Sequence, residues 1–306
     1  MVKRFQDPVI KLKELPEIDY ILISHDHYDH LDLASISRLQ HKVKKCFVAL
    51  GVGRHLEYWG WDVNKIQEFD WWENAKFENI EITFTPSRHF SGRGLTDRAK
   101  SLWGGWVFKT EQESIYWSGD GGYGNHFKEV GEKLGPFDIG FMECGQYNAN
   151  WHLIHMYPEE AVQAAIDAGV KKAVAVHWAG FALAQHTWVN PFERFCKAAE
   201  ENKLEILTPE IGELFKMDEE IPASKLDRNV RAHGNLSEYV PIFLVLLMIL
   251  EISGNASFNY LLLICSIFAY GRLAHAICFG FYVSNPFLRI SGMLCTYLGL
   301  AIFAVR

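Results

Sequence analysis

The sequence has few of the features of a secreted protein. Its six cysteines are widely spaced, none of them forms a Cys-x-x-Cys pair, and three lie in very apolar sequence. This pattern favours reduced, buried thiols and a cytosolic location over an oxidising compartment. Residues 1–17 lack the apolar core of a secretory signal, so we expect no signal peptide.

Charge is also scarce in the last part of the chain. Between residues 239 and 306 only four side chains are Asp, Glu, Lys or Arg: Glu251, Arg272, Arg289 and Arg306. This composition is typical of helices that cross a bilayer, which need roughly 20 apolar residues each. A buried helical bundle in a soluble domain is the alternative, but such bundles rarely run this long without a polar face. We therefore predict three membrane spans, at residues 236–253, 257–282 and 287–305.

The remaining charges are divided unequally along the chain. Residues 1–220 carry 24 Lys and Arg against 34 Asp and Glu, whereas residues 221–306 carry six against three. The acidic balance of the longer part gives no reason to expect nucleic-acid binding. Lys225, Arg228 and Arg231 precede the first predicted span. Because positive charge collects on the cytoplasmic side, we expect the preceding domain to lie in the cytoplasm.

Residues 1–220 alternate short β-rich runs with helical patterns, which predicts a mixed α/β domain. One helix is well marked, with Pro158 and two glutamates in its first turn and Gly169 at its end. The segment DEEIPASKLDRN is charged and contains proline, so we place the boundary between domains 1–220 and 221–306 there. The predicted strands are residues 18–24, 46–50, 80–86, 105–110, 114–120, 138–143 and 172–178.

Ligand-type side chains follow several of these strands directly. Because strand ends meet at one rim of a sheet, we expect these side chains to converge. Seven nitrogen and oxygen donors exceed the four that one tetrahedral zinc uses, and they suit two metal ions that share a bridging ligand. The side chains in this position are His25, His27, Asp29, His30, His89, Asp120 and His177.

The His-x-His-x-Asp-His pattern at residues 25–30 is specific. A shuffled chain of this composition would contain roughly 0.001 copies of it. A solvated polar loop is the alternative interpretation. Four other histidines have no such pattern, and we expect them at the surface or behind the metal ligands: His41, His55, His126 and His186.

Five motifs occur in one order along residues 1–217: SHDHYDHLD, PSRHFSGRGLTDRAKSLWGGWVF, YWSGDGGY, HMYPEEAV and AVHWAGF. Together they resemble the metallo-β-lactamase-fold hydrolases. In particular they resemble the branch that contains the N-acylphosphatidylethanolamine-hydrolysing phospholipase D and the ascorbate-6-phosphate lactonase-like proteins. The resemblance implies an αββα sandwich that binds two zinc ions.

The resemblance also implies roles for single residues. One zinc ion would be bound by His25, His27 and His89, the other by Asp29, His30 and His177, with Asp120 as the bridge. Three residues would act in catalysis: Asp29, which would help to orient the attacking hydroxide, Asp120 and His155. Tyr28 and His155 match positions that face the substrate, and a packing role is the alternative for both.

The N-terminal end departs from this family. Its members usually place one or more β-hairpins before the His-x-His-x-Asp-His strand, whereas 24 residues precede His25 here. The resemblance therefore implies that N-terminal strands of the first sheet are missing from this sequence. We expect an exposed sheet edge, which favours association.

The stretches RNVRAHGNLSEYVPIFLVLLMILE and AYGRLAHAICF resemble a second family, the MAPEG proteins, which are membrane proteins related to microsomal glutathione transferases. The resemblance covers residues 228–306 and implies a homo-oligomer, with a cofactor-binding site between the subunits of a trimer. The residues implied in that site are Arg231, Asn235, Glu238 and Arg272.

The membrane module departs from its family in two ways. The family has four spans, and the span expected before RAHGN is replaced here by the hydrolase domain. Phe279 stands where glutathione-using members often carry Tyr, so we do not predict glutathione transfer. An intramembrane arginine is costly, and the alternative role of Arg272 is to pair with Glu238 or His275 and lock the helix packing.

These features together predict a membrane-anchored dizinc hydrolase that cleaves a phosphodiester in a phospholipid or a small molecule. One alternative is a lactonase or other ester hydrolase that acts on a soluble metabolite. Another is a truncated fusion whose hydrolase half is incomplete and whose membrane half is a structural or glutathione-binding module.

Overall fold

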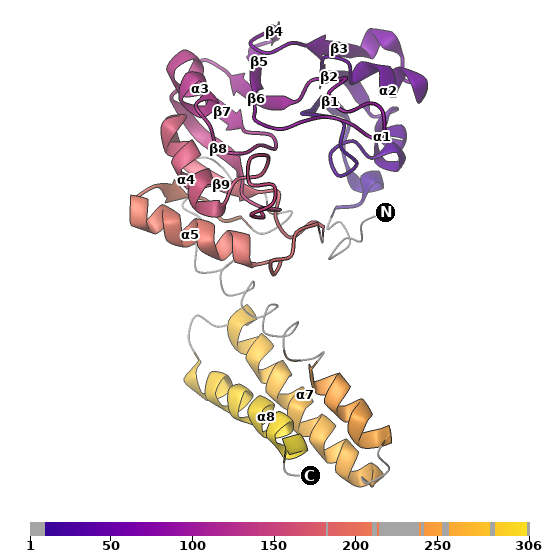
Figure 1. Cartoon of the computed structure of the whole chain (residues 1–306), viewed down its shortest axis with the longest axis vertical. Helices are drawn as coiled ribbons and strands as arrows, with labels where there is room; N and C mark the ends of the chain where they lie inside the picture. Colours follow the sequence, from indigo (N-terminus) through magenta and orange to yellow (C-terminus); the bar gives the residue numbers. More distant parts are fainter. Residues whose placement is uncertain are drawn as a thin grey trace. The chain divides into compact units, whose positions relative to one another are not determined.

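The computed structural model describes residues 10–181, 183–209, 213, 239, 242–252, 257–281 and 285–304. The chain divides into two compact units, Met1–Ile221 and Pro222–Arg306. The first unit contains every strand that the structure describes, and the described part of the second unit is helical (Figure 1).

Short strands and helices alternate along the first unit. Its strands are β1 (Ile18–Ile23), β2 (Val43–Ala49), β3 (Ile66–Phe69), β4 (Asn74–Phe77), β5 (Ile80–Pro86), β6 (Gly104–Lys109), β7 (Ser114–Trp117), β8 (Phe137–Glu143), β9 (Val170–Val176) and β10 (Glu205–Ile206). Its α-helices are α1 (Leu33–Leu39), α2 (Gly53–Tyr58), α3 (His126–Leu134), α4 (Pro158–Asp167) and α5 (Asn190–Asn202), and two 3-10 helices cover Leu12–Glu14 and Val63–Lys65.

The strands form two sheets. The smaller sheet has the order β1-β2-β3 and is parallel, and the larger has the order β10-β9-β8-β7-β6-β5-β4. The larger sheet is antiparallel from β4 to β7 and parallel from β7 to β10. Among the described residues, β1 pairs with β2 only and is therefore an edge strand.

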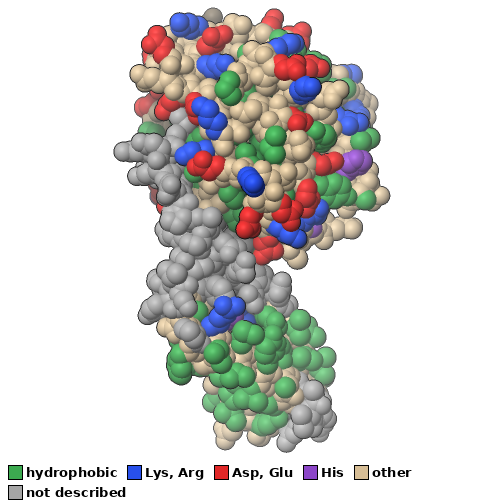
Figure 2. Space-filling model, turned by 90° about the vertical axis from the view of Figure 1, so that its left-hand side faces the viewer, with side chains coloured by type: hydrophobic (Ala, Val, Ile, Leu, Met, Phe, Trp, Pro, Cys, Tyr) green, Lys and Arg blue, Asp and Glu red, His purple; other side chains and the backbone are tan. Residues whose placement is uncertain are grey.

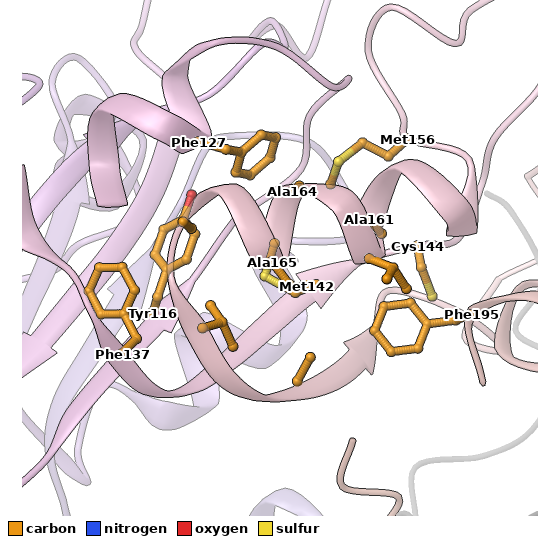
Figure 3. Close-up of a cluster of buried hydrophobic side chains, with 14 of the residues drawn as sticks. Tyr116, Phe127, Phe137, Met142, Cys144, Met156, Ala161, Ala164, Ala165 and Phe195 are labelled. Carbon is orange, nitrogen blue, oxygen red and sulfur yellow. The ribbon is translucent and has the colours of Figure 1, made fainter. Parts of the chain in front are cut away.

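Among the described residues of the first unit, two large hydrophobic cores hold the layers together. The first joins the small sheet to one end of the large one, since Phe47 and Phe69 pack with Phe84 and Trp106 from β5 and β6. The second lies between the large sheet and α3, α4 and α5. There Tyr116 stacks on Phe137 with ring centroids 5.2 Å apart, and alanines of α4 allow that helix to approach the sheet (Figure 3).

The second unit is built of apolar helices. It contains α7 (Phe258–Phe281), α8 (Pro286–Ala304) and the described helical residues Ile242–Ile252. On the face that Figure 2 shows, many hydrophobic side chains lie at the surface of the described part of this unit. Within the described residues one stretch, Phe258–Cys278, is long and apolar enough to cross a bilayer by length and composition.

The fold class expected from the sequence is confirmed: an αββα sandwich is followed by a helical module. All seven predicted strands overlap observed strands. Three strands were not predicted, because β3 and β4 have four residues each and β10 has two. Of the three predicted spans, α7 has spanning length, whereas the described apolar parts of the first and third, Ile242–Ile252 and Phe287–Ile302, are shorter.

Candidate metal centre

The loop after β1 supplies four of the predicted ligands in one tight turn. The N–H groups of His30 and Leu31 both donate to the carbonyl of His27, at 3.0 and 2.8 Å, so the chain reverses between the histidines. Asp32 then accepts a hydrogen bond from the Ser35 N–H and caps α1. The motif is thus held between the end of a strand and a capped helix.

The first group of ring nitrogens converges from two loops. His25 Nε2 lies 3.0 Å from His27 Nδ1, and His89 Nε2 lies 3.1 Å from the same atom. His25 and His89 are buried. The carbonyl of Ile154 lies 2.9 Å from His89 Nδ1, which directs the other ring nitrogen of His89 toward the group.

The second group contains Asp29, His30, Asp120 and His177. Asp120 Oδ2 lies 3.0 Å from His30 Nε2 and 3.2 Å from His177 Nε2, and it also lies 3.9 Å from His25 Nε2. His177 Nε2 lies 3.2 Å from Asp29 Oδ2. One buried carboxylate oxygen is therefore within reach of both groups.

Unusual backbone conformations bring the two late residues into place. Gly119, directly before Asp120, has φ +62°, and a Cβ there would collide with the carbonyl of Gly104, so only glycine fits. His177 itself has φ +65°. A non-glycine residue in this region carries strain, which is typical of functional positions.

Burial and mutual attraction prepare these groups for a cation. Burial lowers the pKa of His25 well below its usual value and that of His89 to about 3, so both rings keep a free lone pair at neutral pH. Burial alone would raise the pKa of Asp120, but the neighbouring His177 and His30 hold it well below its ordinary value. His25 and His89 thus offer neutral imidazoles and Asp120 an ionised carboxylate, donors of the kind that zinc binds.

Two buried carboxylates support the site and were not predicted. Glu143 Oε1 lies 3.2 Å from His155 Nδ1 and 3.4 Å from His177 Nδ1. A carboxylate behind a metal-binding histidine fixes the ring and its tautomer. Glu143 could have been noticed as an acidic residue at the end of an apolar strand, but no spacing rule links it to the histidines.

The second is Asp26, which stands inside the motif between two histidines. Its carboxylate accepts hydrogen bonds from the Gly92 N–H at 2.7 Å and the Ser101 hydroxyl at 2.9 Å, and it lies 3.3 Å from His55 Nε2. Asp26 therefore ties the metal-binding loop to the loop that follows His89 and to α2. His55 thus lies behind the ligands.

His155 and Tyr28 both lie at the site. The His155 ring is 5.1 Å from the ring of His89 and stacks on that of His177 at 5.7 Å, and its contact with Glu143 raises its pKa against the effect of burial. Tyr28 is 65% exposed and donates to the carbonyl of Arg93 at 2.7 Å. His155 thus faces both groups, whereas Tyr28 lies at their rim.

The residues predicted for the membrane-module site are only partly visible. Arg231, Asn235 and Glu238 lie outside the described residues. Arg272 is buried, lies 3.4 Å from the Thr296 hydroxyl, and has its guanidinium 5.3 Å from the centre of the Tyr239 ring.

The sandwich and the donor side chains at its strand ends are typical of metallo-hydrolases. Similar solved structures include Igni18, a metallo hydrolase from Ignicoccus hospitalis, with a TM-score of 0.51 and 20% identity over 65% of this chain and 81% of that one. Residues 2–178 match the model of the beta-lactamase superfamily domain, and the chain belongs to this superfamily. Residues 176–306 match the model of the MAPEG family. The suspected fusion of the two families is thus confirmed.

Curated relatives match more than half of the chain. An uncharacterized protein of Mycobacterium tuberculosis is 41% identical over 215 residues, which are 69% of this chain and 58% of the relative. The N-acyl-phosphatidylethanolamine-hydrolyzing phospholipase D 1 of Caenorhabditis elegans is 34% identical over 59% of this chain and 54% of its own length. The chain therefore spans somewhat more than half of the length of these relatives.

Proposed function

We propose that this chain is a membrane-anchored dizinc hydrolase that cleaves a phosphodiester of a phospholipid, in the manner of an N-acylphosphatidylethanolamine phospholipase D. The observation that carries the proposal is the position of Asp120 Oδ2 between the two donor groups. The name of the Caenorhabditis elegans relative supports the choice of bond and substrate.

The residues present fit two ions. His25, His27 and His89 would hold one, Asp29, His30 and His177 the other, and Asp120 would bridge them; within each set the donor atoms lie within 4.8 Å of one another. When bound, two divalent cations supply Lewis-acid polarisation of the scissile phosphate and lower the pKa of water.

The protein's own side chains would orient the reaction. The Asp29 carboxylate would accept a hydrogen bond from the attacking water and so fix the direction of its lone pair. His155 contacts Glu143 through Nδ1, which leaves Nε2 as the nitrogen that can donate to a phosphate oxygen. Glu143 stabilises the charged form of His155, and a cationic donor binds phosphate more strongly than a neutral one.

The second unit would serve as the anchor. The long apolar stretch Phe258–Cys278 and the MAPEG match support membrane association. The proposal includes a multi-pass, homo-oligomeric module with the hydrolase unit on the cytoplasmic side, as the basic residues before the first span favour. Arg231, Asn235, Glu238 and Arg272 would line the cofactor site of that module.

Metal analysis and a substrate comparison on one preparation test the proposal. We expect two zinc ions per chain and hydrolysis of a phosphodiester in preference to a lactone. Asp120→Asn should lose most of the activity, because the bridge needs a carboxylate. Asp138→Asn is the control, since Asp138 bonds Ser114 and Lys171 away from the site.

The outcomes separate the alternatives. One metal ion or none in folded, undepleted protein would refute the dizinc site and favour a non-catalytic fusion. Two zinc ions with hydrolysis of the lactone alone would instead favour a soluble-metabolite hydrolase.

A further inference from the structure

Several large hydrophobic side chains are exposed on the loops that also carry residues of the metal centre. Leu95 is fully exposed, Tyr28 is 65% exposed and Leu153 is 50% exposed. Leu153 directly precedes Ile154, whose carbonyl lies against His89. Single exposed hydrophobic residues need no explanation, but several around one site indicate a contact surface.

Leu95 lies in a loop with a fixed shape, which we call the Leu95 loop (residues 91–100). The Ala99 N–H donates to the Ser91 carbonyl at 2.9 Å and closes its base. The Asp97 carboxylate accepts hydrogen bonds from the N–H groups of Gly94, at 2.7 Å, and Arg93. A preorganised loop loses little conformational entropy when its apolar side chain is buried by a partner.

The loop is also joined to the metal-binding residues. The Tyr28 hydroxyl donates to the Arg93 carbonyl, and the Arg93 guanidinium lies 4.1 Å from the centre of the Tyr28 ring. On the other side, the Arg98 guanidinium lies 4.3 Å from the ring of Phe90, which packs on the ring of His27. Whatever Leu95 contacts is therefore held beside the metal centre.

The charge of this segment is opposite to that of its domain. Residues 88–100 contain four Lys and Arg but one acidic residue, whereas residues 1–220 carry 24 against 34. Arg98 and Lys100 are exposed. Cations next to an exposed apolar side chain match the anionic and apolar layers of a lipid surface.

We propose that the Leu95 loop inserts its tip into the lipid surface and positions the metal centre over a lipid headgroup. The proposal deepens the proposed function, since it names the bilayer itself as the surface that the catalytic unit contacts. It does not depend on the apolar helices, which anchor the chain by other residues.

Fluorescence quenching tests the contact without requiring activity. The full chain, as Leu95→Trp, is reconstituted into phosphatidylcholine vesicles with and without brominated phosphatidylcholine. Val63→Trp is the matched control, because Val63 is 58% exposed and lies in the 3-10 helix Val63–Lys65. We expect brominated lipid to quench the added emission of Leu95→Trp and not that of Val63→Trp, and phosphatidylglycerol to strengthen the effect. Equal quenching in the two variants would overturn the proposal.

Kinetics supply the second test. Leu95→Asp should lower kcat/KM on an N-acylphosphatidylethanolamine in vesicles about tenfold, because it replaces the proposed apolar contact with lipid by a charge. Turnover of soluble bis(p-nitrophenyl) phosphate should stay unchanged, and Val63→Asp should leave both rates unchanged. Equal vesicle rates for wild type and Leu95→Asp would contradict the loop contact. If the wild type cleaves neither phosphodiester, the proposed function fails, while the quenching result still decides the role of the loop.

Discussion

Glu143 allows the two halves of the metal centre to be tested separately. Its carboxylate lies 3.4 Å from His177 Nδ1 and 3.2 Å from His155 Nδ1, and also accepts from the Met156 N–H at 3.2 Å. None of these contacts involves His25, His27 or His89. Glu143→Gln keeps the volume of the side chain but removes its charge, so it should weaken the binding of only one metal ion, the one that His177 would hold.

The size of the effect follows from the contact. Removing a carboxylate behind a metal-binding histidine typically lowers metal affinity by about 10–100-fold, or about 1.4–2.8 kcal/mol. We expect the zinc content of Glu143→Gln to fall from two toward one when the protein is titrated with a chelator, at a chelator concentration that leaves the wild type loaded. The rate of hydrolysis should fall together with the zinc content.

The control for this titration is Glu129→Gln. Glu129 is exposed in the first turn of α3 and should not affect metal content. A role of Glu143 confined to the second group is refuted if Glu143→Gln loses both metal ions at the same chelator concentration, or if it retains both as tightly as the wild type does.

Other predictions address the rest of the molecule. Asp26→Ala leaves the buried Ser101 hydroxyl and two half-buried groups, the Gly92 N–H and the His55 ring, without their acceptor. We expect a loss of about 3 kcal/mol of stability, seen as a lower unfolding midpoint of the first unit in a thermal melt, and an unchanged midpoint would contradict this role of Asp26. Burial opposes the charged form of His177, but Asp120 and Asp29 raise its pKa well above the usual value, so protons compete with metal for this ring up to a higher pH than for His89. When the protein is dialysed at decreasing pH between about pH 8 and 5, the second metal ion should therefore be released before the first. Simultaneous release of both ions would count against this. A chain ending at Met217 should keep its rate on a soluble phosphodiester and lose much of its rate on liposomes, whereas equal liposome rates at low and high salt would show that the helices do not deliver substrate. The fragment of residues 1–220 should associate through the edge of β1 in light scattering, and a stable monomer would argue against this.

The donor residues could be predicted because their signal is local. A strand that ends in His-x-His-x-Asp-His places four ligands in a few positions, and His89, Asp120 and His177 each follow an apolar run. The supporting residues had no such signal. Asp26 has its role because the distant Gly92 and Ser101 donate to it, and Glu143 because the chain returns at His155 and His177.

Short strands mark the limit of sequence patterns in the fold as well. In β4, with the sequence NAKF, no side chain is buried, so the alternation between its two faces is only one of exposed and half-buried positions. It is a strand because it pairs with β5. Pairing of this kind depends on the neighbouring strand and is not encoded in four residues.

The two donor groups have different requirements for chain length. The first group is complete once residue 89 has been made, whereas the second needs His177, almost ninety positions later. Domains generally fold as units during synthesis. All seven donors exist together only after residue 177 has been made, when β9 can join the large sheet. Metal loading of the second group would therefore report that β9 has taken its place in that sheet.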